Sequence, residues 1–158
     1  MNSTYPYSVD LYAEADGSSP LETWILQLSA AERRTVAAAL RELVAALGQD
    51  VCKTEFCKNI GGGLIELRLR QSESQVLKRV GKQPTENHPE DDAQEILLRI
   101  FFHPHGQKRA LVLHGYSKGR NPSKSHQQVQ IGIAEKRLAR WKALEKLRLR
   151  DEKRPGRG

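Results

Sequence analysis

The chain has 158 residues, of which 38% are hydrophobic and 28% charged, so it is long enough for one ordinary domain and too short for two. Its 26 Lys and Arg residues outnumber its 19 Asp and Glu residues, and the formal net charge of +7 favours a polyanionic partner. No apolar run approaches the roughly 18 residues of a membrane helix, and the first ten residues lack the basic start and apolar stretch of a signal peptide. We therefore expect a cytoplasmic protein with no membrane partner, and we exclude the transmembrane, secreted and fibrous classes.

The first third of the chain predicts one strand followed by two helices. Apolar and polar residues alternate through residues 5–12, as in a half-buried strand. Ser19 and Ser29 each stand three residues before a Glu, the spacing of a helix N-cap, and Pro20 is typical of a first helical position. The second helix carries an apolar stripe that ends at Gly48. We expect these two closely joined helices to form an antiparallel hairpin.

Three strand candidates occupy the middle of the chain. Residues 64–70 alternate, with apolar side chains on one face and charged side chains on the other. Residues 96–102 are apolar throughout except at Arg99, which is typical of a central strand, and residues 110–116 form the third candidate. A turn is predicted at 103–106, between the last two strands.

The last element is predicted to be a basic helix. Asn121 and Pro122 have the residue types of a helix cap and a first helical position, so we expect the helix to begin there. Basic residues crowd it from Lys136 through Arg150, which indicates either electrostatic attachment to nucleic acid or a solvated helix face. We expect residues 151–158 to form a disordered tail.

The order of these elements predicts the fold class. One strand, two helices, three antiparallel strands and a final helix form a small α+β domain, with the helices gathered against one small antiparallel sheet. We expect a single domain over residues 1–158, with a core at about 5–141, an acidic insertion at 71–95 and a basic tail at about 145–158.

Charge is distributed unevenly along the chain. Residues 1–60 carry five bases and eight acids, residues 61–132 eleven and seven, and residues 133–158 ten and four. Residues 71–95 oppose this trend, with six acids and three bases. This segment is either a floppy insertion, a mobile lid, or an acidic flap that mimics RNA and shields a basic face.

Cys52 and Cys57 are the only cysteines, and no second Cys or His pair stands at zinc-finger spacing. We interpret them as two reduced thiols in a cytosolic protein, and we expect no metal site and no cofactor.

Arg99 is the charged residue that packing explains least. Every neighbour in its strand is apolar, and a buried guanidinium without a partner costs several kcal/mol. Either Glu66 forms an ion pair with it across the adjacent strands, or Arg99 binds a phosphate group bidentately. Arg68 and Arg70 share a face with Glu66, which extends the predicted cationic surface.

Residues 114–120 bring together the groups that metal-free RNA cleavage requires. His114 and Tyr116 precede Lys118 and Arg120 at the end of the third strand, and His126 follows at the helix start. Such groups can take a 2′-hydroxyl proton, stabilise the crowded phosphorane and protonate the leaving oxygen. The alternatives are a hydrogen-bonded, half-buried strand histidine for His114 and an exposed surface residue for His126. His103 and His105 are interpreted as turn residues, because H-x-H without a third ligand is weak evidence for a metal.

Four short segments together resemble a known toxin family. They are GGGLIELR at 61–68, LRIFF at 98–102, LVLHGYSK at 111–118, and AEKR at 134–137 in the Pro122-led helix. Their order resembles the phage-derived HigB-like branch of the RelE/ParE toxin superfamily over roughly residues 5–141.

The resemblance implies the toxin of a type II toxin–antitoxin pair, with a RelE-like fold. Such a toxin is an mRNA endoribonuclease that cleaves on the ribosome by metal-independent 2′-hydroxyl attack and so inhibits translation. The implied partners are the ribosome, mRNA and a cognate helix-turn-helix antitoxin, with which the toxin forms a hetero-oligomer.

The resemblance also assigns roles to residues, position by position. Arg99 and Lys118 would clamp the phosphate, and either His114 or His126 would transfer protons. Glu66 and Tyr116 would position these groups. The residues expected to support RNA binding are Arg68, Arg70, Arg120 and Lys124.

Two departures bear on catalysis. Gly119 stands where many relatives have a second Lys, and the insertion 71–95 replaces a short turn. Two other functions therefore stay open, a non-catalytic ParE-like gyrase poison and a phage-remnant RNA-binding or regulatory protein.

Overall fold

A computed structural model describes residues 5–120 and 122–153 of the protein. Its strands are β1 Ser8–Leu11, β2 Cys57–Gly61, β3 Leu64–Leu69, β4 Leu98–His105 and β5 Arg109–Ser117. Its α-helices are α1 Pro20–Leu26, α2 Ala30–Ala39, α3 Glu73–Arg79 and α4 Lys124–Glu152, and α2 continues as a π-helix over Leu40–Ala45. Short 3₁₀ turns cover Gly48–Lys53, Pro89–Ala93 and Lys118–Arg120.

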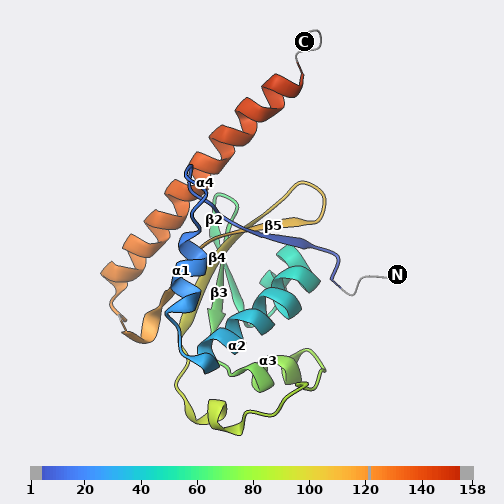
Figure 1. The fold of residues 1–158 in the computed structure, drawn as a ribbon, viewed down its shortest axis with the longest axis vertical. Coiled ribbons are helices and arrows are strands. Elements are labelled where there is room, and N and C mark those ends of the chain that lie inside the picture. Colours follow the sequence, from blue (N-terminus) through green and yellow to red (C-terminus); the bar gives the residue numbers. More distant parts are fainter. Residues whose placement is uncertain (1–4, 121, 154–158) are drawn as a thin grey trace.

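The five strands form one mixed sheet in the order β1-β5-β4-β3-β2 (Figure 1). The pairs β2–β3, β3–β4 and β4–β5 are antiparallel, whereas β1 lies parallel to β5 with Ser8 opposite Arg109. The predicted α+β class and C-terminal helix are confirmed, but the sheet is mixed rather than antiparallel. The reason is that β1 pairs with the last strand along the chain, so no tight hairpin sets its direction.

The edge strand β2 was not predicted from the sequence. Its Lys58 and Asn59 are exposed, and the segment lacks the apolar alternation that marks a strand. Pairing with β3 through a turn at Gly62 and Gly63, both with positive φ, supplies the order that local sequence lacks.

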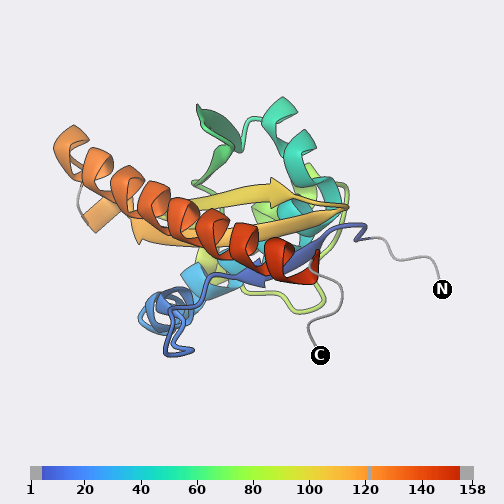
Figure 2. The same ribbon diagram turned by 90° about the horizontal axis from the view of Figure 1, so that it is seen from above.

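The sheet separates two apolar clusters. Figure 2 shows α4 running across the strands. One face packs against α1 and α2, and its core includes Leu43, Leu67 and Ile100. The other face packs against α4 through Phe101, Leu113 and other apolar residues. Each strand therefore presents its alternate side chains to different helices, and the charged residues of β3 face α4.

The insertion 71–95 is folded against α2 rather than extended into solvent (Figure 1). It contains α3, which begins with a capping box and buries two apolar side chains against the domain. Arg34 donates two hydrogen bonds to the buried carboxylate of Asp91, with distances of 2.7 and 2.6 Å. Lys82 pairs with the buried Glu42 at 2.8 Å. These two ion pairs hold the segment to the helical layer.

Helix α4 differs from the predicted helix at its first turn. Ser123 is the N-cap, and its hydroxyl accepts a hydrogen bond from the His126 N–H at 3.1 Å, so the helix begins after Pro122. Asn121 and residues 154–158 lie outside the described residues, whereas Asp151, predicted to be in the disordered tail, is helical.

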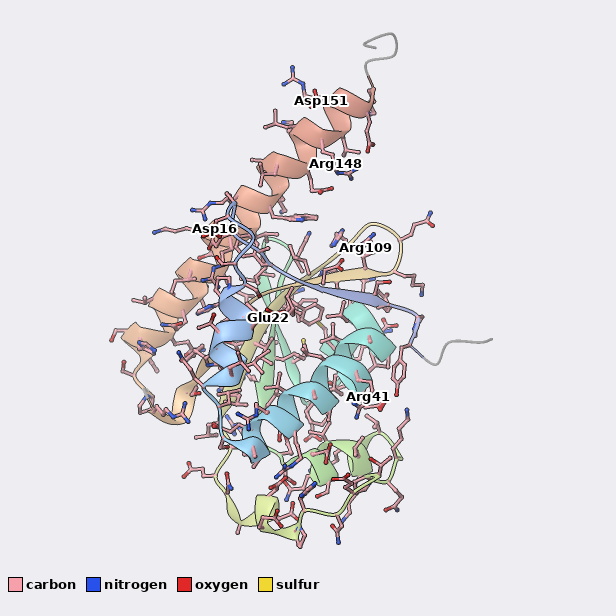
Figure 3. All side chains as sticks on the ribbon, viewed as in Figure 1. Asp16, Glu22, Arg41, Arg109, Arg148 and Asp151 are labelled. Carbon is pink, nitrogen blue, oxygen red and sulfur yellow. The ribbon has the colours of Figure 1, made fainter. Side chains whose placement is uncertain are left out.

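Figure 3 shows Arg148 and Asp151 on the end of α4 that projects past the sheet. In the described part of the chain, no helix is long and apolar enough to span a bilayer.

The turn predicted at 103–106 lies further along the chain. Strand β4 continues through His105, and the reversal occurs at 106–108, where Gly106 and Lys108 have φ of 54° and 59°. The ring of His105 packs 4.5 Å from that of Trp141 on α4. This tertiary contact extends the strand beyond what the local turn residues indicate.

A glycine-to-alanine pair tests how closely α1 packs on the sheet. A Cβ at Gly115 would stand 2.4 Å from the ring of Trp24, whereas a Cβ at Gly132 on α4 meets nothing within 4 Å. We expect Gly115→Ala to lower the free energy of unfolding by about 1–3 kcal/mol because of overpacking. Gly132→Ala should raise it by up to about 1 kcal/mol. Urea denaturation measures both, and equal effects of the two variants would contradict the packing of Trp24 on β5.

Candidate functional site

Arg99 lies at the centre of the sheet, on the face covered by α4. It is only 2% exposed, with Arg68 directly opposite on β3 and Tyr116 directly opposite on β5. Among the described residues, its Nε finds no hydrogen-bond partner. A buried charged group usually has its hydrogen bonds completed by the protein, so this enclosed N–H is a donor that the described residues leave unused.

Glu66 does not supply the ion pair that was one interpretation of Arg99. Its fully buried carboxylate stands opposite Phe101 and accepts a hydrogen bond from Arg68 Nε at 2.9 Å. Gln127 of α4 donates to its other oxygen at 3.3 Å. Burial lowers the pKa of Arg99, Glu66 opposes that effect, and Arg68 adds to it. Glu66 therefore holds Arg68, while Arg99 keeps an unused donor.

Lys118 and Arg70 complete a group of four cations with Arg68 and Arg99, which we call the cationic cluster. The backbone N–H of Lys118 donates to the Leu97 carbonyl at 2.8 Å, which fixes the residue at the end of β5. The pKa of Lys118 is lowered by burial first, and then by Arg99, Arg68 and Arg70. Glu66 offsets part of the repulsion among these four charges, and a second anion bound beside them would relieve more of it.

Tyr116 and His126 border the cationic cluster. The Tyr116 ring stacks on Phe101 with centroids 6.2 Å apart and meets the His126 ring edge-on at 5.6 Å. Its side chain is 5% exposed, and its buried hydroxyl lies beside Arg99, which partly opposes the effect of burial on the pKa of the phenol. Burial raises the pKa of this phenol, so it stays protonated at neutral pH and can donate a hydrogen bond.

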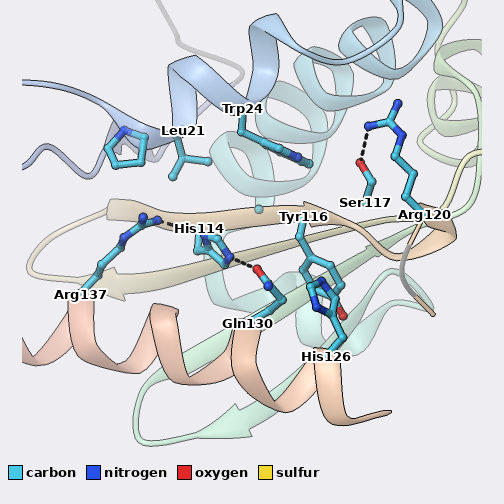
Figure 4. Close-up of a pocket in the computed structure, with 11 residues that line it drawn as sticks. Leu21, Trp24, His114, Tyr116, Ser117, Arg120, His126, Gln130 and Arg137 are labelled. Atoms are coloured by element: carbon cyan, nitrogen blue, oxygen red, sulfur yellow. Dashed lines mark hydrogen bonds between the residues drawn. The ribbon is translucent and has the colours of Figure 1, made fainter. Parts of the chain in front are cut away.

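His114 is held by two residues of α4 (Figure 4). Arg137 Nη1 lies 3.0 Å from its Nδ1, and Gln130 Oε1 contacts its Nε2. Because Arg can only donate, Nδ1 is the acceptor, and Nε2 donates its hydrogen to Gln130. Burial lowers the pKa of His114, which favours this neutral ring. Both ring nitrogens are engaged, so His126 is the histidine better placed to exchange a proton.

A cleft of about 360 Å³ runs beside the second half of β5, between α1 and α4 (Figure 4). It exists because β1 pairs with β5 only as far as Val112, which leaves the edge of the strand beyond it without a partner strand. His114, Tyr116 and His126 line the cleft together with Trp24. The two histidine candidates and the tyrosine thus share one hollow.

Arg120 and Lys124 lie apart from the cationic cluster. Arg120 donates to Glu32 of α2 at 3.1 Å and to the Ser117 hydroxyl at 3.2 Å. Lys124 is exposed on the first turn of α4. The structure therefore brings six predicted site residues to one face of β3, β4 and β5: Glu66, Arg68, Arg70, Arg99, Tyr116 and Lys118.

Three polar residues of α4 contribute to the site and were missed in the sequence. Gln127, Gln130 and Arg137 contact Glu66, His114 and the Leu113 carbonyl. The sequence did contain one sign of their role. These three polar residues lie on the helix face next to Ala134 and Leu138, where apolar residues would be expected.

His103 and His105 form a separate aromatic stack. Their rings are parallel at 6.0 Å, and the His103 ring meets Trp141 edge-on at 5.8 Å. Within the described ranges, no three His, Cys, Asp or Glu side chains gather closely enough to hold a metal ion.

Comparison with known proteins identifies no relative of this chain. No protein-family model, no curated protein and no solved structure matches the chain. The resemblance to the RelE/ParE superfamily rests on the sequence motifs alone.

The buried, neutral His114 predicts a specific pH dependence of stability. Its pKa in the folded protein lies below the ordinary value of 6.5, so the unfolded chain binds the extra proton first as the pH falls. Stability is therefore full above that ordinary value and is lost progressively below it. His114→Gln keeps an acceptor and a donor without titrating, and should lose less stability between about pH 7.5 and 5.5. Thermal unfolding at both pH values measures this difference, and equal losses in the two proteins would contradict the assignment.

Proposed function

We propose that the protein is the toxin of a type II toxin–antitoxin system, with a RelE-like fold in which α1 and α2 form the N-terminal helical hairpin. In this proposal it is an mRNA endoribonuclease that acts on the ribosome without a metal. The observation that carries the proposal is the buried Arg99, whose Nε has no hydrogen-bond partner among the described residues and which lies among three more cations and one carboxylate, Glu66. A phosphodiester is the ligand that fits such a site, because it has the charge and the acceptor oxygens that the cations lack.

RNA cleavage requires the site to accept a proton, to stabilise the charge that develops on the phosphate, and to donate a proton. The 2′-hydroxyl loses its proton and attacks the adjacent phosphorus, a cyclic phosphate forms, and the 5′-oxygen leaves with a proton. In our proposal, Arg99 and Lys118 hold the phosphate and stabilise the charge that develops on it. His126, beside the Tyr116 ring, is the proton-transfer group, and His114 acts as a positioning residue. Glu66 orients Arg68 toward the same phosphate.

The basic helix α4 fits a large nucleic-acid partner. Residues 133–158 carry ten bases and four acids, and the described part of this segment is exposed along its projecting end. We propose that this end contacts ribosomal RNA while the cationic cluster holds the mRNA. A cognate helix-turn-helix antitoxin would cover the site, with the toxin and antitoxin forming a hetero-oligomer in the cytoplasm.

Substitutions in the cationic cluster test the proposal. Arg99→Ala and Lys118→Ala should each slow cleavage of ribosome-bound mRNA by about 100-fold or more, because each removes a donor to the developing negative charge. Expression of the wild-type chain should arrest growth and leave mRNA cut in the ribosomal A site. Lys53→Ala changes an exposed cation on the 3₁₀ turn and serves as the control, with expected activity equal to wild type.

Three outcomes would contradict the proposal. Intact mRNA during growth arrest would exclude ribonuclease activity, and DNA breaks with continued translation would favour the gyrase poison. Absence of any growth effect would favour the third alternative, a phage-remnant RNA-binding or regulatory protein. Circular dichroism of each variant separates loss of activity from loss of fold.

A further inference from the structure

Cys52 and Cys57 lie in direct contact outside the candidate site. Cys52 is on the 3₁₀ turn Gly48–Lys53 and Cys57 is the first residue of β2. Both thiols are free and half-buried, and the Cys57 S–H donates to Cys52 Sγ at 3.0 Å. The fold therefore holds the two sulfur atoms about one ångström beyond the length of a disulfide bond.

The short connection between the two cysteines is itself fixed. The Thr54 hydroxyl donates to the Val51 carbonyl at 2.6 Å and accepts from the Phe56 N–H at 3.2 Å. Glu55 forms an ion pair with Arg79 of α3. These contacts hold the turn and the strand in position, so contact between the thiols does not depend on chance closure of a flexible loop.

Cys52 is also reachable from solvent. It lines a cleft of about 490 Å³ together with Asp50, Lys53 and Asn59. Cys57 is not part of this lining, so an electrophile entering the cleft meets Cys52 first. A compound about the size of a tripeptide disulfide can place one sulfur at the mouth of such a cleft.

We propose that Cys52 and Cys57 form a reversible dithiol site that low-molecular-weight disulfides oxidise to an intramolecular disulfide. The Cys52 thiolate attacks one sulfur of oxidised glutathione, the glutathione S–S bond breaks, and one glutathione leaves as a thiolate. The Cys57 thiolate then attacks Cys52 Sγ and displaces the second glutathione. The two protein thiols lose two electrons and two protons, which the two released glutathione molecules take up.

The location of the site links it to the sheet. Cys57 pairs with Leu67 of β3, and the carbonyl of the preceding Phe56 accepts the Arg68 N–H at 2.6 Å. The disulfide would fasten the 3₁₀ turn to the edge strand that adjoins Arg68. Burial and the hydrogen bond to Cys52 raise the pKa of Cys57, so closure should be faster at higher pH.

Redox titration of the full chain tests the proposal. The reduced protein is equilibrated with mixtures of reduced and oxidised glutathione, quenched with acid, alkylated and weighed by mass spectrometry. The folded chain should lose both alkylation sites together, with a mass about 2 Da lower. At a fixed concentration of reduced glutathione, this should need about tenfold less oxidised glutathione than in urea. Dithiothreitol should restore both thiols.

Single-cysteine variants provide the matched control. Cys57→Ser should stop at a mixed disulfide with glutathione on Cys52, and thermal unfolding shows whether the variant is folded. A stable glutathione adduct on the wild-type chain, or closure no easier in the folded chain than in urea, would overturn the proposal. This test is independent of ribonuclease activity.

Discussion

Arg99 is 2% exposed on strand β4, and its Nε has no hydrogen-bond partner among the described residues. A charged group in this position costs free energy unless something else stabilises it. The nearest carboxylate, Glu66, is already bonded to Arg68 and Gln127. The sheet therefore presents a guanidinium whose hydrogen bonds are incomplete, and a bound anion would complete them.

Helix α4 shapes this site by packing on the sheet face that carries Arg99, so that Glu66, Arg99 and Tyr116 are all buried. Its first turns bring Gln127 to Glu66 and Gln130 to His114, while Arg137 bonds the Leu113 carbonyl. Apolar packing of α4 against Phe101 and other core residues holds these polar contacts in register. The same helix thus helps to bury His114, which lowers the pKa of its ring, and places His126 beside Tyr116.

Much of the fold was predictable because it depends on local pattern: the strands β3, β4 and β5, the capped helices, and the isolation of Arg99 in an apolar strand. The alternation of Glu66 and Arg68 also placed both correctly on one face. Strand β2 and the docking of segment 71–95 depend on tertiary contacts, such as Arg34 with Asp91, which no local pattern contains. For the same reason, the sequence did not decide which arginine pairs with Glu66. It also did not decide which of His114 and His126 has both ring nitrogens engaged in hydrogen bonds.

In our proposal, Arg99 completes its hydrogen bonds with an RNA phosphate. Nuclear magnetic resonance of the chain labelled with ¹⁵N-arginine tests it most directly, during titration with an RNA that 2′-O-methylation protects from cleavage. We expect the Arg99 Nε–H resonance to shift and its hydrogen exchange to slow as RNA binds, because the phosphate would accept that hydrogen bond. Saturation with RNA that leaves the Arg99 resonance and its exchange rate unchanged would contradict it.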